Sequence, residues 1–170
     1  IEALLETYKA EHKGVLPKKE SGIQVNNFIK ETIEQLSSIF KLHNKKIDFT
    51  TELANNFTAD IDIFLTKRVI NNLILNALSY SANSDKIDIF LKHTDKGFSI
   101  SIKDYGIGIE KEDIDKIFNK FYSGKSNLKQ ASTGLGLYLS NKIIKALGGT
   151  IEVKSEKNKG SVFTITLPVK

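Results

Sequence analysis

The sequence contains no cysteine, methionine or tryptophan, and only two prolines among its 170 residues. Without cysteine, a disulfide framework and a thiolate metal site are both excluded, which fits a reducing compartment. No stretch approaches the run of about 20 apolar residues that spans a bilayer, and residues 1–10 do not form a signal peptide. We therefore expect a soluble domain that is not itself inserted in a membrane.

Arginine is also nearly absent, because Arg68 is the only one, and the net charge of +5 comes almost entirely from lysine. This charge favours a polyanionic ligand or partner. The lysines are scattered and show no basic run with interleaved aromatic residues, so nucleic acid is not expected as a partner. The chain starts at Ile1 without methionine, in a segment with helical periodicity. We expect residues 1–21 to be the end of an upstream helix plus a linker, and residues 22–170 to form one domain.

Hydrophobic periodicity predicts an α+β fold. Hairpin-linked strands alternate with amphipathic helices, so we expect a two-layer α/β sandwich in which one mixed, mostly antiparallel sheet carries helices on one face. Lys18–Gly22 is polar enough to be a linker, and either Asp60 or Asp62 can cap the central helix. The predicted elements are a helix capped by Asn26 and running to Phe40, a strand over 47–53, a central helix over 68–80, a hairpin over 87–102, a short helix over 114–121, a helix over 134–147 and a hairpin over 151–167.

The central helix carries polar amides within an apolar sequence. On a period of about 3.6 residues, Asn72, Asn76 and Tyr80 share one stripe beside the apolar face. A buried amide costs about 1–3 kcal/mol unless it is hydrogen-bonded or coordinates a ligand. An asparagine oxygen suits Mg2+ that takes its other oxygens from a nucleotide's phosphates and from water. Two core amides satisfied by nearby backbone explain the pattern equally well.

Two glycine-rich turns add weaker signals. Asp104-x-Gly106-x-Gly108 ends a predicted strand, where glycine lets a planar ligand approach the backbone and the carboxylate can accept a hydrogen bond from an exocyclic amine. An ordinary Asp-Gly turn is the alternative. Gly134-x-Gly136 opens a helix and is either a phosphate cradle or a tight entry into that helix. Since neither turn lies in a βαβ unit, a Rossmann site is not indicated.

In this order, the segments resemble the catalytic and ATP-binding domain of bacterial two-component sensor histidine kinases, which has the Bergerat or GHKL type of fold. The resemblance covers about Val25 to the C-terminus. The family's N, G1, F and G2 boxes read here Asn72-Leu73-Ile74-Leu75-Asn76-Ala77 with Tyr80, Asp104-Tyr105-Gly106-Ile107-Gly108-Ile109, Ile117-Phe118-Asn119-Lys120-Phe121-Tyr122, and Thr133-Gly134-Leu135-Gly136-Leu137.

The resemblance implies a role for each matching residue. Asn76 would be the Mg2+ ligand and Asn72 its phosphate-side partner, and these two amides would carry the catalytic role. Asp104 would accept the adenine amine. A polar segment of unusual length, about 122–133, would be the ATP lid. The other expected nucleotide-binding residues are Tyr80, Gly106, Gly108, Ile109, Phe121, Lys125, Thr133, Gly134, Leu135, Gly136 and Leu137.

The sequence departs from the family's pattern at two positions. Ser79 stands where the family often has lysine or arginine to meet phosphate, so the positive charge would come from Lys125 or Lys129, although a solvated loop explains both lysines too. Ser132 replaces a glycine that often precedes the last motif, which should stiffen the lid slightly. Because Ser79 carries no positive charge, a degenerate nucleotide-binding or regulatory module without kinase activity is an alternative interpretation.

Topoisomerase, mismatch-repair and heat-shock ATPases and anti-sigma-factor kinases share this type of fold, and they place a catalytic glutamate where this chain has Asn72. An amide cannot accept a proton, so a conformational ATPase is disfavoured.

The three histidines, His12, His43 and His93, have neither metal-ligand spacing nor the sequence setting of the family's phosphoacceptor. The resemblance therefore implies that the chain transfers the γ-phosphoryl of Mg-ATP to a histidine on a separate upstream dimerisation domain, which then passes it to a response regulator. Residues 1–21 would be the end of that domain. The parent protein would be a homodimer anchored in the cell membrane, with this domain in the cytoplasm.

Overall fold

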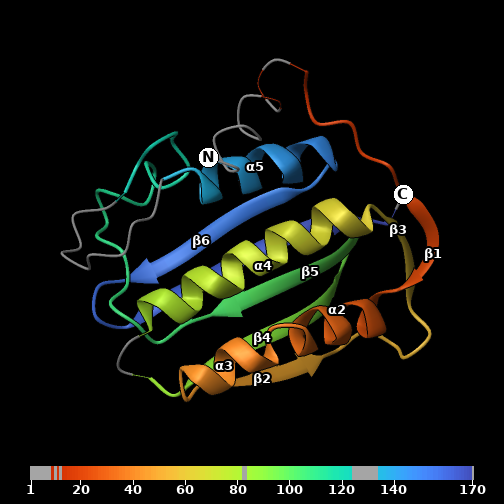
Figure 1. The fold of residues 1–170 in the computed structure, drawn as a ribbon. Helices are drawn as coiled ribbons and strands as arrows, with labels where there is room; N and C mark the ends of the chain where they lie inside the picture. Colours follow the sequence, from red (N-terminus) through yellow and green to blue (C-terminus); the bar gives the residue numbers. More distant parts are fainter. Residues whose placement is uncertain (1–8, 10, 12, 82–83, 124–133, 170) are drawn as a thin grey trace.

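The computed structural model describes residues 9, 11, 13–81, 84–123 and 134–169. A five-stranded sheet forms one layer, and helices cover one of its faces (Figure 1). The strand order is β2-β4-β5-β7-β6, in which β2 and β4 are parallel and the other neighbours are antiparallel. The predicted fold is thus confirmed. The elements are β1 Glu20–Gln24, α2 Val25–Glu34, α3 Ser37–Leu42, β2 Lys46–Thr51, β3 Thr58–Ile61, α4 Ile63–Tyr80, β4 Lys86–Thr94, β5 Gly97–Lys103, α5 Gly136–Ala146, β6 Thr150–Glu156 and β7 Gly160–Pro168.

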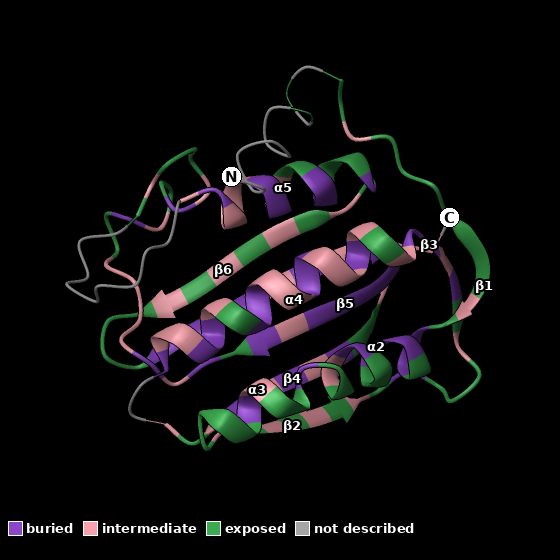
Figure 2. Cartoon of the chain, in the orientation of Figure 1, coloured by how far each residue is buried: buried purple, intermediate pink, exposed green. Residues whose placement is uncertain are grey.

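The core lies between α4 and the sheet. Leu73 and Ile74 of α4 are fully buried, as are the alternate residues of β4 and β5 that face the helices, such as Ile89 and Ile100 (Figure 2). Asp62 caps α4, since its side chain accepts a hydrogen bond from the Leu65 N–H at 2.8 Å, and one of the two predicted caps is therefore confirmed.

The outer side of α4 is not buried, although the apolar residues that almost surround this helix in the sequence predict a helix buried in the core. Leu75 is 38% exposed and Phe64 is 72% exposed. The reason is the two-layer architecture, because no further layer covers the outer face of α4 in the described part of the chain (Figure 1). None of the described helices combines the length and the apolar character that crossing a membrane requires.

A second, two-stranded sheet lies beside the first and contradicts the predicted linker over Lys18–Gly22. The strand β1 begins at Glu20 and pairs antiparallel with β3, a strand that was not predicted. The Gly22 N–H also donates to the Asp60 side chain at 3.1 Å. The pairing partners are far apart in the sequence, β1 is short and mostly exposed, and the alternation in β3 extends over only four residues, so the local signal for both strands is weak.

The predicted role of Asn26 as a helix cap is also wrong. The N-cap of α2 is Gln24, and Asn26 is buried inside the helix. Its amide donates to the Ala54 carbonyl at 3.0 Å and accepts from the Thr51 hydroxyl at 2.7 Å, so it joins α2 to the end of β2. The predicted single helix to Phe40 is interrupted at residues 35–36, and α3 follows.

The predicted short helix over 114–121 is a series of tight turns in the structure. Hydrogen bonds between residues three apart close these turns, as from the Lys116 N–H to the Asp113 carbonyl at 2.9 Å. Ile117 is buried and Phe118 packs edge-on against Phe163 of β7, whereas Phe121 is 58% exposed.

Candidate functional site

Segments that are far apart in the sequence meet along α4. The Ile107 N–H donates to the Tyr80 carbonyl at 3.3 Å, and a Cβ atom on Gly106 would overlap that carbonyl. A Cβ atom on Gly136 would lie 2.5 Å from the Asn72 Oδ1. The structure thus brings the asparagine-bearing helix, the Asp104 turn and the start of α5 to one side of the molecule (Figure 1).

Residues Asp104–Ile109, which we call the base loop, follow β5. The Asp104 side chain is only 3% exposed and accepts a hydrogen bond from the Gly106 N–H at 2.9 Å. Burial raises the pKa of this carboxyl above its ordinary value, and hydrogen bonds from backbone N–H groups only partly oppose that effect. A buried carboxylate beside a glycine is poised to accept one further hydrogen bond from a ligand.

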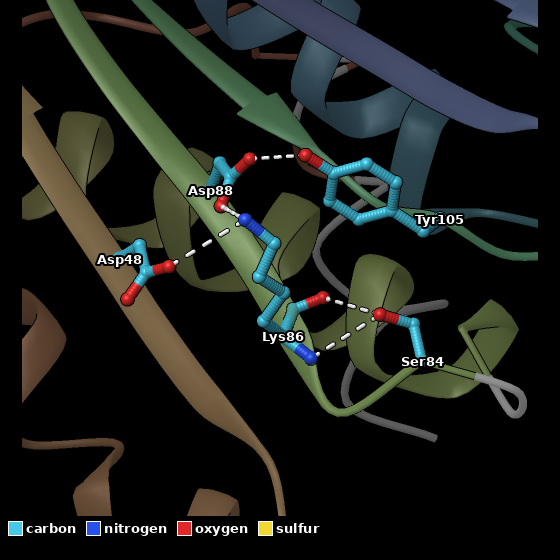
Figure 3. A network of polar contacts seen from close by, with 5 residues as sticks. All are labelled: Asp48, Ser84, Lys86, Asp88 and Tyr105. Atoms are coloured by element: carbon cyan, nitrogen blue, oxygen red, sulfur yellow. Dashed lines mark hydrogen bonds and ion pairs between the residues drawn. The ribbon is translucent and has the colours of Figure 1, made fainter.

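Tyr105 anchors the base loop on the face of the sheet that is directed away from the helices (Figure 3). Its hydroxyl donates to Asp88 of β4, and Asp88 also pairs with Lys86 at 3.2 Å. The Lys103 ammonium lies 4.5 Å from the centroid of the Tyr105 ring. Because consecutive side chains point to opposite sides, this anchor leaves Asp104 directed toward the helices.

The two asparagines of α4 have different surroundings. The Asn72 amide donates to the Ser140 hydroxyl of α5 at 3.0 Å, and Ser140 is buried. The half-buried Asn76 side chain makes no hydrogen bond within the described part of the chain. Tyr80, on the same stripe, is also half-buried. The Asn72 nitrogen is therefore bound to α5, whereas the Asn72 oxygen and the Asn76 amide make no hydrogen bond within the described part of the chain. The roles of both amides toward a nucleotide stay predictions.

The N-terminus of α5 completes the site. Gly134 has a φ of +63°, Leu135 is buried, and the helix begins at Gly136 without a side-chain cap and without an acidic residue in its first turn. Backbone N–H groups at this end carry the positive end of the helix dipole and can bind an anion. Ile109 and Leu137 are half-buried at the two ends of the site.

The segment before the predicted lid contacts the start of α5. The Phe121 N–H donates to the Gly134 carbonyl at 3.1 Å, while the Phe121 side chain is 58% exposed. A hydrogen bond with buried Asp113 raises the pKa of Tyr122 to about 12. Lys125, Lys129, Ser132 and Thr133 lie outside the described residues, as does the predicted lid apart from residues 122–123.

The predicted hairpin over 151–167 is confirmed as β6 and β7, but sequence reasoning missed its contact with the base loop. The Asn158 N–H donates to the Ile107 carbonyl at 2.7 Å, and the Ile109 N–H donates to the Ser155 hydroxyl at 2.8 Å. A Cβ atom on Gly108 would overlap the Glu156 carbonyl, so the hairpin contacts the base loop directly. These contacts join segments that are distant in the chain, and a local pattern gives no signal for them.

The two ends of the site complement the two ends of a nucleotide. A buried carboxylate beside close-approach glycines suits the exocyclic amine and flat face of adenine, and a glycine-fronted helix N-terminus suits phosphate. The fold and the site together define an ATP-binding domain.

Comparison with known proteins leads to a specific family. Residues 61–170 match the family described as histidine kinase-, DNA gyrase B- and HSP90-like ATPases, and the chain belongs to it. The signal transduction histidine-protein kinase ArlS of Staphylococcus aureus is 33% identical over 171 aligned positions, and the alignment covers 97% of this chain and 36% of ArlS. The catalytic domain of histidine kinase ThkA superposes with a TM-score of 0.77 at 26% identity, over 89% of this chain and 96% of that domain.

A second ThkA structure, in complex with the response regulator protein TrrA, shares the fold with a TM-score of 0.82 at 24% identity, over 99% of this chain and 47% of that chain. The predicted resemblance is confirmed: within the family, the chain corresponds to the ATP-binding catalytic domain of sensor histidine kinases. The chain spans about a third of the length of the curated relatives it matches.

The buried Asp104 carboxyl predicts a pH-dependent stability. Its pKa in the folded domain lies above the ordinary 3.8, so its favourable contribution is complete below that pH and is lost as the pH rises through the folded pKa. We expect Asp104→Asn to match the wild type in free energy of unfolding at low pH and to exceed it at neutral pH. Urea denaturation between pH 3.5 and 8 measures this difference.

The control is Asp95→Asn, which removes one charge from the exposed turn between β4 and β5. An Asp104→Asn domain that is less stable than the wild type at neutral pH would contradict the argument.

Proposed function

We propose that this domain transfers the γ-phosphoryl group of Mg-ATP to a histidine on a separate dimerisation domain of its parent protein, for relay to a response regulator. The observation that carries the proposal is the convergence on α4 of a buried carboxylate, an uncommitted amide and the glycine-fronted start of α5. ArlS and ThkA are named histidine kinases, and ThkA has been solved with the response regulator TrrA, which supports the acceptor and the partner.

At the base end, Asp104 accepts a hydrogen bond from the adenine amine. Its carboxylate is buried and one of its oxygens accepts the Gly106 N–H, which fixes the direction of the group. Gly106 and Gly108 let the purine lie close to the backbone, and the neighbouring Ile109 and Tyr80 give apolar contact. At the other end, the N–H groups of Gly134, Leu135 and Gly136 bind phosphate oxygens, and Leu137 and Phe121 flank them. Thr133, which precedes Gly134 in the sequence, contributes to the same phosphate contacts.

Asn76 is the residue that fits a Mg2+ ion. The described residues hold no cluster of three or more histidine, cysteine or acidic side chains, so a cation here would depend on a neutral oxygen and on the nucleotide's own phosphates. The Asn76 amide is half-buried and makes no hydrogen bond in the described ranges, which fits that role. Bound Mg2+ would neutralise charge on the phosphates. Lys125 or Lys129 would add the positive charge that Ser79 does not provide.

Asn72 argues against hydrolysis of ATP by an activated water. Its side chain is an amide, which cannot serve as a general base, and its nitrogen is already bound to Ser140. His43 is exposed, and His93 packs edge-on against Phe57 at 4.7 Å between ring centroids. The domain therefore positions the nucleotide, and the nucleophile and its base come from the acceptor domain.

The parent protein follows from this division of roles. Residues 22–170 form the catalytic domain, and β1, which begins at Glu20, already belongs to its fold through the pairing with β3. The parent is a homodimer anchored in the cell membrane. This part of the proposal follows from the resemblance to sensor histidine kinases.

The first test is nucleotide binding by the purified chain. We expect calorimetric titration with the non-hydrolysable analogue AMPPNP and Mg2+ to give saturable binding. Asp104→Asn should weaken it about tenfold or more, because an amide presents a donor where the adenine amine also donates. Asp95→Asn, at an exposed turn, should bind as the wild type does. Equal affinity for wild type and Asp104→Asn would remove Asp104 from its assigned role.

The second test concerns Mg2+. For the wild type, adding Mg2+ should tighten AMPPNP binding. Asn76→Ala should lose most of this gain, while its affinity for AMPPNP in EDTA, without Mg2+, should equal that of the wild type. Asn27→Ala, an exposed asparagine on α2, is the matched control. If Asn76→Ala keeps the full effect of Mg2+, another residue holds the ion.

The third test concerns the acceptor. With γ-labelled ATP, the chain alone should acquire no acid-labile phosphate, whereas the parent's dimerisation domain, supplied as a separate polypeptide, should become labelled. Stable phosphohistidine on this chain would contradict the proposal. Steady phosphate release without that partner would support the conformational ATPase, and nucleotide binding without any transfer would support a degenerate module.

A further inference from the structure

The hairpin between β6 and β7 holds the base loop through three hydrogen bonds. The Asp104 N–H donates to the Ser161 carbonyl at 2.9 Å, the Asn158 N–H donates to the Ile107 carbonyl at 2.7 Å, and the Ile109 N–H donates to the Ser155 hydroxyl at 2.8 Å. The first two join backbone to backbone, so any residue type could supply them. The third depends on the side chain of Ser155.

The Ser155 hydroxyl is fully committed. Its oxygen lies 3.0 Å from the Gly160 carbonyl and 2.9 Å from the Ser161 hydroxyl, in addition to the Ile109 N–H. A carbonyl only accepts, so the Ser155 proton goes to Gly160, and the two lone pairs of Ser155 accept from Ile109 and Ser161. One donor and two acceptor sites are thereby filled, which fixes the orientation of the hydroxyl.

The surrounding backbone leaves the loop little room to move. A Cβ atom on Gly108 would overlap the Glu156 carbonyl, and one on Gly160 would overlap the Asp104 carbonyl. The loop and the hairpin are therefore in direct contact on both sides of the Ser155 hydrogen bond. The far end of the loop also has an ion pair between Glu110 and Lys157, but both side chains are well exposed, so that pair adds little.

We propose that Ser155 is a positioning residue for the nucleotide base: its hydroxyl holds Ile109, and with it the Gly106–Gly108 surface, at the level where adenine meets the backbone and Asp104. This inference rests on the proposed function of the same site. The Ser155 hydroxyl bonds to the loop and to its own hairpin and makes no hydrogen bond to the described start of α5, so it acts on recognition of the base and not on binding of the phosphates.

The test compares Ser155→Ala with Ser101→Ala. Ser101 also forms a hydroxyl–hydroxyl hydrogen bond between neighbouring strands of the same sheet, with Thr164 at 2.8 Å, on the face directed away from α4. We expect Ser155→Ala to weaken ADP binding about three- to tenfold, the effect of one or two lost hydrogen bonds, and Ser101→Ala to leave it unchanged. Ser155→Thr, which keeps the hydroxyl, should restore the affinity.

A purely structural role would not change the preference between bases. Inosine diphosphate carries an oxygen in place of the adenine amine, so the ratio of its dissociation constant to that of ADP reports on base recognition. We expect Ser155→Ala to reduce this ratio. Hydrogen exchange measured by NMR should be faster at the Ile109 amide of this variant. The midpoint of its urea unfolding should be close to that of Ser101→Ala.

The outcomes separate the two proposals. If the wild type binds ADP and Ser155→Ala keeps both the affinity and the ratio, the positioning role is wrong while the proposed function stands. An equal loss for both nucleotides would also overturn it. If the wild type itself binds no ADP, the proposed function fails and the role of Ser155 in base recognition fails with it, whatever the exchange of the Ile109 amide shows.

Discussion

The packing of α4 on the sheet is the constraint on which the site depends. The helix buries Leu73 and Ile74 completely, which fixes its rotation about its own axis. The polar stripe of Asn72 and Asn76 can then lie only along the edge of the buried face, beside α5. The contact between Asn72 and Ser140 and the close approach of Gly136 follow from that rotation. The polar groups are thus preorganised by apolar packing before any ligand arrives.

At the base end of the site, the buried Asp104 carboxylate lowers the stability of the folded domain. Burial of Asp104 raises its pKa, which means that the folded domain is less stable with the carboxylate ionised than it would be with a neutral side chain. Backbone N–H groups from the loop offset part of this penalty. A residue that opposes folding and yet is held by a rigid loop is typical of a functional position, and here it coincides with the residue assigned to adenine.

Prediction from sequence succeeded where the signal is local and failed where it depends on distant pairing. The periodicity of α4, the hairpin of β4 and β5 and the cap at Asp62 are encoded within a few residues each. The pairing of β1 with β3 and the burial of Asn26 against the end of β2 depend on contacts that no local window contains. In the site, motif residues such as Asp104 and Gly136 could be found by their types and order. Ser155 could not, because its role exists only once β6 lies beside the base loop.

The two ends of the site are held in different ways, and this difference bears on how the domain would work. The base loop is fixed on one side by the β6–β7 hairpin and on the other by Tyr105 and Asp88, so its shape is set by the sheet. Within the described residues, the hydrogen bonds of Asn72 with Ser140 and of Phe121 with Gly134 hold the start of α5, and Gly136 lies close against Asn72. In the proposed function, the fixed base loop would keep the adenine in place while the γ-phosphoryl group is presented to an incoming histidine.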